Sequence, residues 1–149
     1  MHVPGAPAFQ QTSPADKPWI ARINFVLLFF KDNLFLMGGL LSDGSYANDI
    51  WSTPYVYGDV NPWNDNGVAS WSGREGHQGV VHTVEDVEYV FIMGGQGTGQ
   101  TFLHDVYKWT ADGSAKWELV TAAPAWKPRW AFGYVASGVR GAWCVVHAV

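Results

Sequence analysis

A short pattern occurs three times in this chain: a Trp, an Arg three positions later, and an aromatic ring three positions after the Arg. The copies are Trp19/Arg22/Phe25, Trp71/Arg74/His77 and Trp126/Arg129/Phe132. They begin 52 and 55 residues apart, and three of the chain's four arginines belong to them. Such a regular spacing of about fifty residues indicates a fold built from structural repeats.

A second pattern lies between the copies of the first, and its two copies are 56 residues apart. They are Met37-Gly38-Gly39 with Asp49-Ile50-Trp51, and Met93-Gly94-Gly95 with Asp105-Val106-Tyr107. Together the two patterns divide the chain into a first unit at 19–71, a second unit at 72–120 and a partial third unit at 121–149. A proline-rich tail or linker at 1–18 precedes them.

Composition and charge argue against several classes of function. The chain has 149 residues, which suits one domain. Its formal net charge of −4 and its lack of a basic run argue against a nucleic-acid partner and against docking on an anionic membrane. Cys144 is the single cysteine, so no intrachain disulfide can form. The chain also lacks an Asn-x-Ser/Thr acceptor, and both features favour an intracellular or organellar location.

Neither the tail nor the most apolar segment is typical of a targeting or membrane signal. The tail holds four of the chain's eight prolines and no apolar core, so it is predicted to be an extended linker rather than a signal peptide. Phe25–Phe30 is a continuous apolar run, but it is far too short to cross a bilayer. We therefore expect a strand covered on both faces there, and no membrane partner.

Apolar runs separated by turn residues predict four short strands in each complete unit. In the first unit they are Phe25–Phe30, Leu34–Met37, Asn48–Tyr55 and Val68–Trp71, with loops at Leu40–Ala47 and Gly58–Gly67. In the second unit they are Gln78–Val84, Glu88–Met93, His104–Thr110 and Lys116–Val120, with a glycine-rich loop at Gly94–Gln100. The third unit contributes Phe132–Ser137 and Trp143–Val149. No segment has helical apolar spacing, so an all-β fold with almost no helix is expected.

The order of these features resembles the kelch repeat, which forms one blade of a β-propeller. Both share four short strands, a Gly-Gly after the second strand, an aromatic residue in the third and a Trp in the fourth. The resemblance covers about residues 19–149 and implies kelch-type blades of four-stranded antiparallel sheets. It rests on these structural repeat positions: Arg22, Gly38, Gly39, Asp49, Trp51, Trp71, Arg74, Gly94, Gly95, Asp105, Tyr107, Trp117 and Arg129.

The chain departs from the kelch pattern in three ways. The first unit is short before its Gly-Gly and carries an insertion at Val56–Ala69. In the second unit either Trp117 or Trp126 fits the closing Trp, and strand order favours Trp117. Finally, the chain supplies about two and a half units, whereas propellers have roughly four to eight blades.

The small number of units indicates an incomplete propeller. We expect the chain to be a fragment of a larger propeller, or to complete one with copies of itself or with another chain. The predicted strand Trp143–Val149 is apolar and stands at the end of the sequence. An exposed strand of this kind is a docking edge, so it is the predicted route of self-association.

The repeated residues have physical roles that do not depend on the family name. Glycines after the second strand permit positive φ and the close approach of a neighbouring backbone. Aromatic residues of the third and fourth strands can pack between adjacent blades. Each arginine can stack near a Trp while it bonds a carbonyl or an Asp. Asp49 and Asp105, which are equivalent by repeat, are therefore interpreted as structural residues rather than as a catalytic pair.

The sequence does not predict a catalytic, cofactor or metal site. The five histidines are dispersed, and His77 fills the position held by Phe25 and Phe132, so a structural role is expected for it. The others are His2, His82, His104 and His147. Gly95–Gly99 is rich in glycine like a nucleotide-binding loop, but a strand rather than the required helix is expected after it.

The kelch resemblance implies a protein-interaction module rather than an enzyme, because such propellers offer loops on one face to a protein partner. We expect Gly95–Phe102 and Val56–Ala69 to form the contact surface, since binding residues concentrate in loops. The candidate partner-binding residues are Trp63, Asn64, Asp65, Asn66, Gln96, Thr98, Gln100 and Phe102.

Two alternative functions are also considered. One is a fragment of a galactose-oxidase-like copper enzyme, which shares kelch-type blades. That site needs a Cys–Tyr crosslink with His and Tyr ligands, and neither Cys144 nor the dispersed histidines match it. The other is a structural subunit of a larger assembly, which would use the same surfaces as an interaction module.

Overall fold

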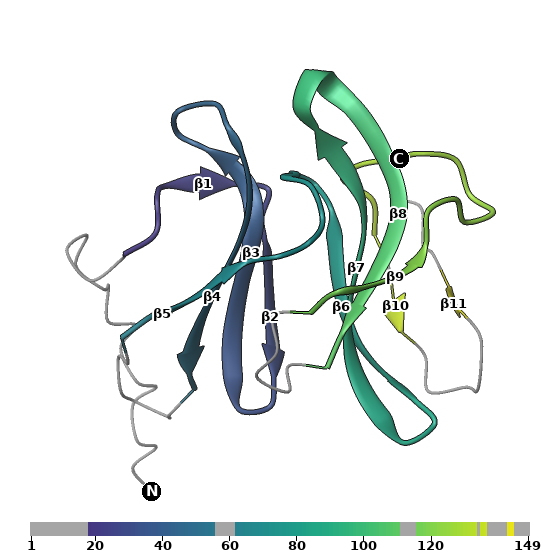
Figure 1. Ribbon diagram of the computed structural model, residues 1–149, viewed down its shortest axis with the longest axis horizontal. Helices are drawn as coiled ribbons and strands as arrows, with labels where there is room; N and C mark the ends of the chain where they lie inside the picture. Colours follow the sequence, from purple (N-terminus) through teal and green to yellow (C-terminus); the bar gives the residue numbers. More distant parts are fainter. Residues whose placement is uncertain (1–17, 56–61, 111–115, 134, 137–142, 145–149) are drawn as a thin grey trace, which may run out of the picture.

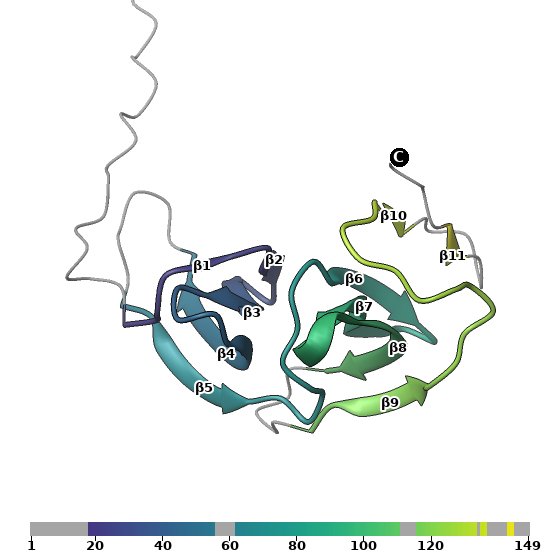
Figure 2. The same cartoon turned by 90° about the horizontal axis from the view of Figure 1, so that it is seen from above.

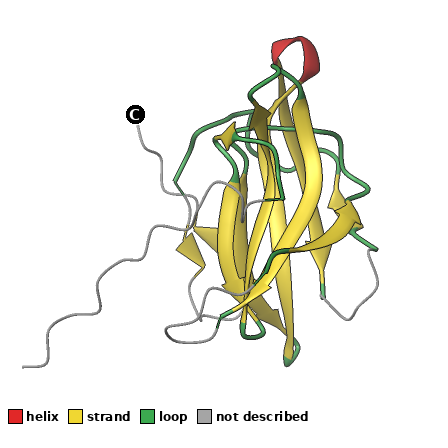
Figure 3. Cartoon of the chain, turned by 90° about the vertical axis from the view of Figure 1, so that its left-hand side faces the viewer, coloured by secondary structure: helices red, strands yellow, loops and turns green. Residues whose placement is uncertain are grey.

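The computed structural model describes residues 18–55, 62–110, 116–133, 135–136 and 143–144. Two antiparallel sheets stand side by side, and a short strand pair lies next to the second sheet (Figure 1). Within the described residues, the one helical segment is the 3-10 turn η2 (Thr98–Gln100), at the tip of a hairpin (Figure 3). The all-β expectation is confirmed. The described part of the chain contains no helix with the length and hydrophobicity needed to cross a bilayer.

The first sheet has five strands. They are β1 (Arg22–Ile23), β2 (Val26–Phe30), β3 (Asn33–Leu41), β4 (Tyr46–Pro54) and β5 (Asn64–Val68). Both β1 and β2 pair with β3, on the side away from β4, and β5 lies at the outer edge. Lys31 and Asp32 form the tight turn between β2 and β3, with φ of 45° and 59°.

The second sheet repeats this arrangement. Its strands, in spatial order, are β6 (Gln78–Val84), β7 (Val87–Gly97), β8 (Thr101–Trp109) and β9 (Glu118–Thr121). Glu85 and Asp86 turn from β6 to β7 with φ of 49° and 65°. An isolated bridge between Glu75 and Gln96 takes the place that β1 has in the first sheet. All four strands predicted for this unit are present.

The third unit is described only in part. Strand β10 (Val135–Ala136) pairs with β11 (Trp143–Cys144), within the predicted strands Phe132–Ser137 and Trp143–Val149. Residues 137–142 and 145–149 lie outside the described residues, as do residues 1–17 of the predicted tail. The predictions of a docking edge at the last strand and of an extended tail therefore stay predictions.

The Gly-Gly pairs lie inside strands, which corrects two predicted loops. Leu40–Ala47 was expected to be a loop, but β3 runs to Leu41 and β4 starts at Tyr46. Gly94–Gln100 was expected to be a loop, but β7 continues to Gly97. In each strand the register shifts at the Gly-Gly, and its glycines have positive φ. Glycine thus lets the strand bulge and continue instead of ending it.

The fourth strand of the first unit was placed too late in the sequence. It was predicted at Val68–Trp71, but β5 covers Asn64–Val68 and pairs with β4. The prediction of a loop at Gly58–Gly67 is therefore wrong from Asn64 onward, while 56–61 lie outside the described residues. Every residue of β5 is exposed, because the strand lies at the sheet edge. Its Asn- and Asp-rich sequence has no apolar alternation that would mark a strand.

The main core lies between the two sheets. The first sheet contributes Val26, Phe30, Phe35, Met37 and Ile50, and the second contributes Val90, Ile92 and Trp109. Trp71 and Trp117 also belong to this cluster, and Trp117 stacks on Trp109 with ring centroids 5.4 Å apart. Aromatic residues therefore pack between units as expected. Trp117 shares this cluster with Trp71, whereas Trp126 packs against the cluster that contains Phe132, so the assignment of Trp117 as the second unit's closing Trp stays a prediction.

Each sheet has two faces, which we name by the direction of the repeat. The front face points to the following unit and the back face points away from it. The front face of the second sheet buries Val80, Phe91, Met93 and Val106 with Phe132 of the third unit. Seen from above, β2, β6 and β10 lie next to one another along the inner side, with β5 and β9 at the outer edges (Figure 2).

Backbone hydrogen bonds between units repeat with the same pattern. The amide of Gly39 donates to the carbonyl of Arg74 (2.8 Å), and that of Gly95 donates to the carbonyl of Arg129 (2.9 Å). A second series joins the inner strands: the amide of Gly76 donates to Asn24, and the amide of Ala131 donates to Gly76. Because both junctions use equivalent atoms, the units are related by one repeated contact.

Replacement of Gly38 by Ala is expected to destabilise the protein more than replacement of Gly44. Both glycines have positive φ (62° and 86°), so Ala is strained at either site by about 1–2 kcal/mol. At Gly38 an added Cβ would lie 2.8 Å from His77 Cε1, whereas at Gly44 nothing lies within 4 Å. Crowding should add roughly 1–3 kcal/mol for Gly38→Ala in urea unfolding. Equal losses for the two variants would contradict the close junction.

Candidate functional site

Each repeated arginine joins strands of its own sheet through hydrogen bonds to a glycine carbonyl and to an aspartate. Arg22 donates to the carbonyl of Gly38 (3.0 Å) and to both carboxylate oxygens of Asp49 (2.5 and 2.8 Å). Arg74 donates in the same way to Gly94 (2.9 Å) and to Asp105 (2.6 and 2.9 Å). The two arginine side chains are 1% and 0% exposed. This confirms that both aspartates are structural partners of arginine.

Aromatic rings complete the environment of Arg74. Its guanidinium lies 5.5 Å from the ring centroid of Trp71 and 5.8 Å from that of Tyr107. A cation between two ring faces is stabilised by their quadrupoles. The Trp, Arg and strand-three aromatic of the sequence pattern are thus one packed group, which explains why they recur together.

Asp49 is held in its ionised form. Burial alone would raise the pKa of Asp49, but hydrogen bonds from Arg22 and from Trp51 Nε1 (2.7 Å) outweigh burial and leave the pKa below its ordinary value. A carboxylate with all its neighbours donating to it is a poor general acid or base at neutral pH. The geometry therefore makes Asp49 the counter-charge of the buried Arg22 guanidinium.

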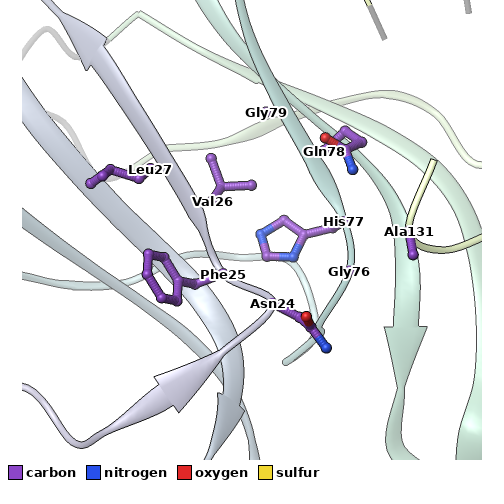
Figure 4. Close-up of a pocket in the computed structure, with 9 residues that line it drawn as sticks. All are labelled: Asn24, Phe25, Val26, Leu27, Gly76, His77, Gln78, Gly79 and Ala131. Atoms are coloured by element: carbon purple, nitrogen blue, oxygen red, sulfur yellow. The ribbon is translucent and has the colours of Figure 1, made fainter. Parts of the chain in front are cut away.

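A pocket of about 270 Å³ opens beside the inner strands β2 and β6 (Figure 4). Three units contribute to it, through Asn24, His77 and Ala131 among others. The Asn24 side-chain amide donates to Glu75 Oε2 (2.7 Å), so that group is already paired. Among the residues that line the pocket, His77 is the titratable one.

His77 is a buried, neutral ring. It is 2% exposed, packs 5.7 Å from Trp71, and neither ring nitrogen has a hydrogen-bond partner. Burial, helped by the charge of Arg74, lowers the pKa of His77 to about 3. The ring therefore acts as a packing group, in the position where Phe25 and Phe132 stand in the other units. This is the structural role that the sequence pattern predicted.

The predicted contact residues near Gly95–Phe102 lie at one hairpin. Thr98 and Gln100 belong to the exposed turn η2, and Phe102 follows it with 47% of its surface exposed. Gln96 is half-buried, and its amide and carbonyl pair with Glu75. This turn and the β3–β4 turn of the first unit lie at the same end of the sheets (Figure 1).

The predicted contact residues of the first unit lie elsewhere. Asn64, Asp65 and Asn66 are in edge strand β5, where Asn64 pairs with Ser52 near the end of β4 remote from the β3–β4 turn. Trp63 packs edge-to-face on Trp19, 5.9 Å between centroids. The structure therefore does not bring the two predicted contact groups together. They lie on different sheets and toward opposite ends of the strands.

A third exposed surface was missed by the sequence analysis. Phe25, Leu27 and Phe29 lie on or beside the back face of the first sheet, and they are 37%, 54% and 52% exposed. The analysis assigned Phe25–Phe30 to a strand covered on both faces, and this is wrong for the back face. The apolar run itself gave no sign that one face of this strand is exposed.

The described residues were searched for a group of side chains that could hold a metal ion. Among the residues that the structure describes, no three His, Cys, Asp or Glu side chains gather closely enough to hold a metal ion. His82 and His104 stand on β6 and β8, away from Asp49. The Cys144 side chain, His2 and His147 lie outside the described residues.

Comparison with known proteins does not add a relative. A scan against models of protein families finds no match, and a search of curated proteins finds none either. The kelch resemblance therefore stays a prediction. Function has to be argued from the exposed surfaces and the packed groups above.

Removal of the Asp105 carboxylate is expected to destabilise the second sheet severely. Asp105→Ala leaves the guanidinium of Arg74 buried without its counter-charge, which should cost roughly 3–5 kcal/mol of unfolding free energy. Glu118→Ala is the control, because the Lys108–Glu118 pair (3.2 Å) has a 69% exposed carboxylate side chain. It should cost less than about 1 kcal/mol in urea titrations. Similar losses of unfolding free energy in the two variants would refute the stabilising role of the Arg74–Asp105 pair.

Replacement of His77 by Phe is expected to make stability less sensitive to acid. The folded-state pKa of about 3 lies below the ordinary value of 6.5, so the unfolded chain binds a proton first as pH falls. Stability from this group is complete above pH 6.5 and decreases below it, by about 2 kcal/mol between pH 7 and pH 5. His77→Phe should lose this part of the pH dependence, measured by urea unfolding at each pH. Identical slopes for both proteins would contradict a buried neutral ring.

Proposed function

We propose that the sheets are successive kelch-type propeller blades and that the protein is a protein–protein interaction module. In this proposal the β7–β8 turn, from Thr98 to Phe102, contacts the partner. The observation that carries the proposal is the exposed aromatic ring of Phe102 beside a fully exposed polar turn, held on two long paired strands. Phe102 supplies apolar contact area at low entropic cost, as aromatic anchors do in protein interfaces.

The blade interpretation is supported by equivalence between the units. Each sheet has a Gly-Gly bulge, in β3 or in β7, and an Arg–Asp pair whose arginine is buried. In each, the amide of the second glycine donates to the carbonyl of the next unit's arginine. Repetition of one junction between successive antiparallel sheets is what a propeller requires.

The binding role of the turn is supported by its rigidity and by its position. The strands that carry the turn are 11 and 9 residues long and pair up to Gly97 and Thr101. The exposed side chains of Thr98, Gln100 and Phe102 therefore project from a fixed base. A binding loop on a rigid scaffold loses little conformational freedom when it meets a partner.

A photo-crosslinking amino acid at position 102 should capture a discrete protein partner. The same amino acid at position 87, an exposed site in the turn region between β6 and β7, is the matched control and should not capture it. With the purified partner, Phe102→Ser should weaken binding by roughly 2 kcal/mol, about thirtyfold in Kd, as expected for an anchor residue. Urea unfolding verifies that the variant is folded. Unchanged affinity of Phe102→Ser would exclude this turn as the contact.

A structural subunit of a larger assembly is the second candidate function. It is favoured by the exposed apolar side chains of the first sheet, Leu27 and Phe29, since soluble proteins seldom leave such a patch uncovered. This surface is separate from the β7–β8 turn, so the two candidates are tested by different variants.

A further inference from the structure

Strand β5 contains the one Asn-Gly pair of the chain, Asn66-Gly67. In such a pair the main-chain nitrogen of the glycine can attack the side-chain amide carbon of the asparagine and form a five-membered imide. Glycine favours this reaction because it has no Cβ to hinder the attack and allows many main-chain conformations. In a folded protein the reaction depends on how exposed the pair is and how firmly its strand is held.

The pair lies at an irregular point of an exposed edge strand. Every residue of β5 is exposed, and the strand stands at the outer edge of the first sheet (Figure 2). The register of β5 against β4 shifts here, so that Asn66 and Gly67 together stand opposite Ile50. Gly67 has a φ of 79°, as expected for the glycine of a β-bulge. The pair therefore lies outside the regular register of the two strands.

Strand β5 can open at low cost. Its register with β4 consists of three residue pairs, and its own residues bury little surface. Segments with few buried apolar contacts open locally with a small free energy. Asn66 Nδ2 donates to Ser52 Oγ (2.8 Å), and this bond is released when the strand opens. Opening then lets the main chain of Asn66 rotate and brings its side-chain carbon to the Gly67 nitrogen.

The carboxylate of Asp65 is placed to accept the proton that the reaction removes. The main-chain amide of Gly67 donates to Asp65 Oδ1 at 2.8 Å. This amide nitrogen is the attacking atom, and it has to lose its hydrogen as it bonds to carbon. A general base has to lie within hydrogen-bond reach of the proton that it takes, and Asp65 meets this condition before the reaction starts.

We propose that Asn66 is a site of spontaneous deamidation in the folded protein, with Asp65 as the proton acceptor. The Gly67 nitrogen bonds to Asn66 Cγ, and its proton passes to Asp65 and on to Nδ2. The bond between Cγ and Nδ2 breaks, and Nδ2 leaves as ammonia. Water then opens the imide and gives aspartate or isoaspartate at position 66.

Both products change the edge of the first sheet. Each adds a negative charge next to Asp65, and isoaspartate also adds a methylene to the main chain of β5. Neither product keeps the amide that donates to Ser52 Oγ. The modified strand is therefore expected to pair less firmly with β4, which faster hydrogen exchange of β5 would report.

Incubation of the full-length protein at neutral pH, followed by peptide mapping with fragment-ion sequencing, tests the proposal. Position 66 should show the mass change of an amide converted to an acid, and part of the product should be a substrate for an isoaspartate-specific methyltransferase. Asn64 is the internal control and should stay unmodified. It is exposed in the same strand, but it lies in register with Ser52 and precedes Asp65 instead of a glycine.

Three results would overturn the proposal. The first is an unmodified Asn66 in protein that stays folded, and the second is modification only after urea has unfolded the protein. Aspartate without isoaspartate is the third, because it would mean that water attacks the side chain directly and no imide forms.

Asp65→Asn tests the proton acceptor. Asparagine keeps an oxygen that can accept the Gly67 hydrogen bond, but it lacks the charge needed to take the proton, so deamidation at position 66 should slow by about tenfold. Asp32→Asn, at an exposed carboxylate in the turn between β2 and β3, is the matched control and should leave the rate unchanged. Urea unfolding verifies that both variants are folded. An unchanged rate in Asp65→Asn would exclude Asp65 as the acceptor.

Discussion

The structure depends on repeated arginines whose side chains bond within their own sheet while their main chains bond to the neighbouring unit. The side chain of Arg74 is fully buried and holds Gly94 and Asp105 within its own sheet, while its main-chain carbonyl accepts a hydrogen bond from Gly39 of the preceding unit. A buried guanidinium is tolerated only when its donors are satisfied, so the aspartate and the carbonyl have to stay in place. One residue therefore fixes both the arrangement of strands in its own sheet and the contact with the preceding sheet.

The two sheets differ in how much of their two faces is buried. The second sheet is covered on both faces, because its back meets Phe35 and Met37 and its front meets Phe132. On the back face of the first sheet Leu36 is buried, whereas Leu27 and Phe29 are more than half exposed. The contacts between units therefore bury both faces of the second sheet but leave side chains on the back of the first sheet exposed.

Much of the fold could be predicted from the sequence, because each pattern occurs at least twice and the two copies could be compared. The hairpin of β6 and β7, the roles of Arg74 and Asp105, and the packing role of His77 were all expected. The boundaries near glycine were wrong, since a glycine in a sequence marks a special φ without saying whether the strand ends or bulges there. Strand β5 was missed because an exposed edge strand buries no side chain and leaves no apolar alternation.

The sequence by itself determined the repeat, the all-β class and the arginines, aspartates and Gly-Gly pairs that recur in each unit, because these depend on local patterns that recur along the chain. Only the tertiary structure decided which surfaces stay exposed. The residues predicted for partner contact, such as Asn64 and Phe102, lie on different sheets, and Phe25 is exposed where His77 is buried. Exposure is set by the neighbour that packs against a residue and not by the residue's own identity, so it could not be read from one unit's sequence.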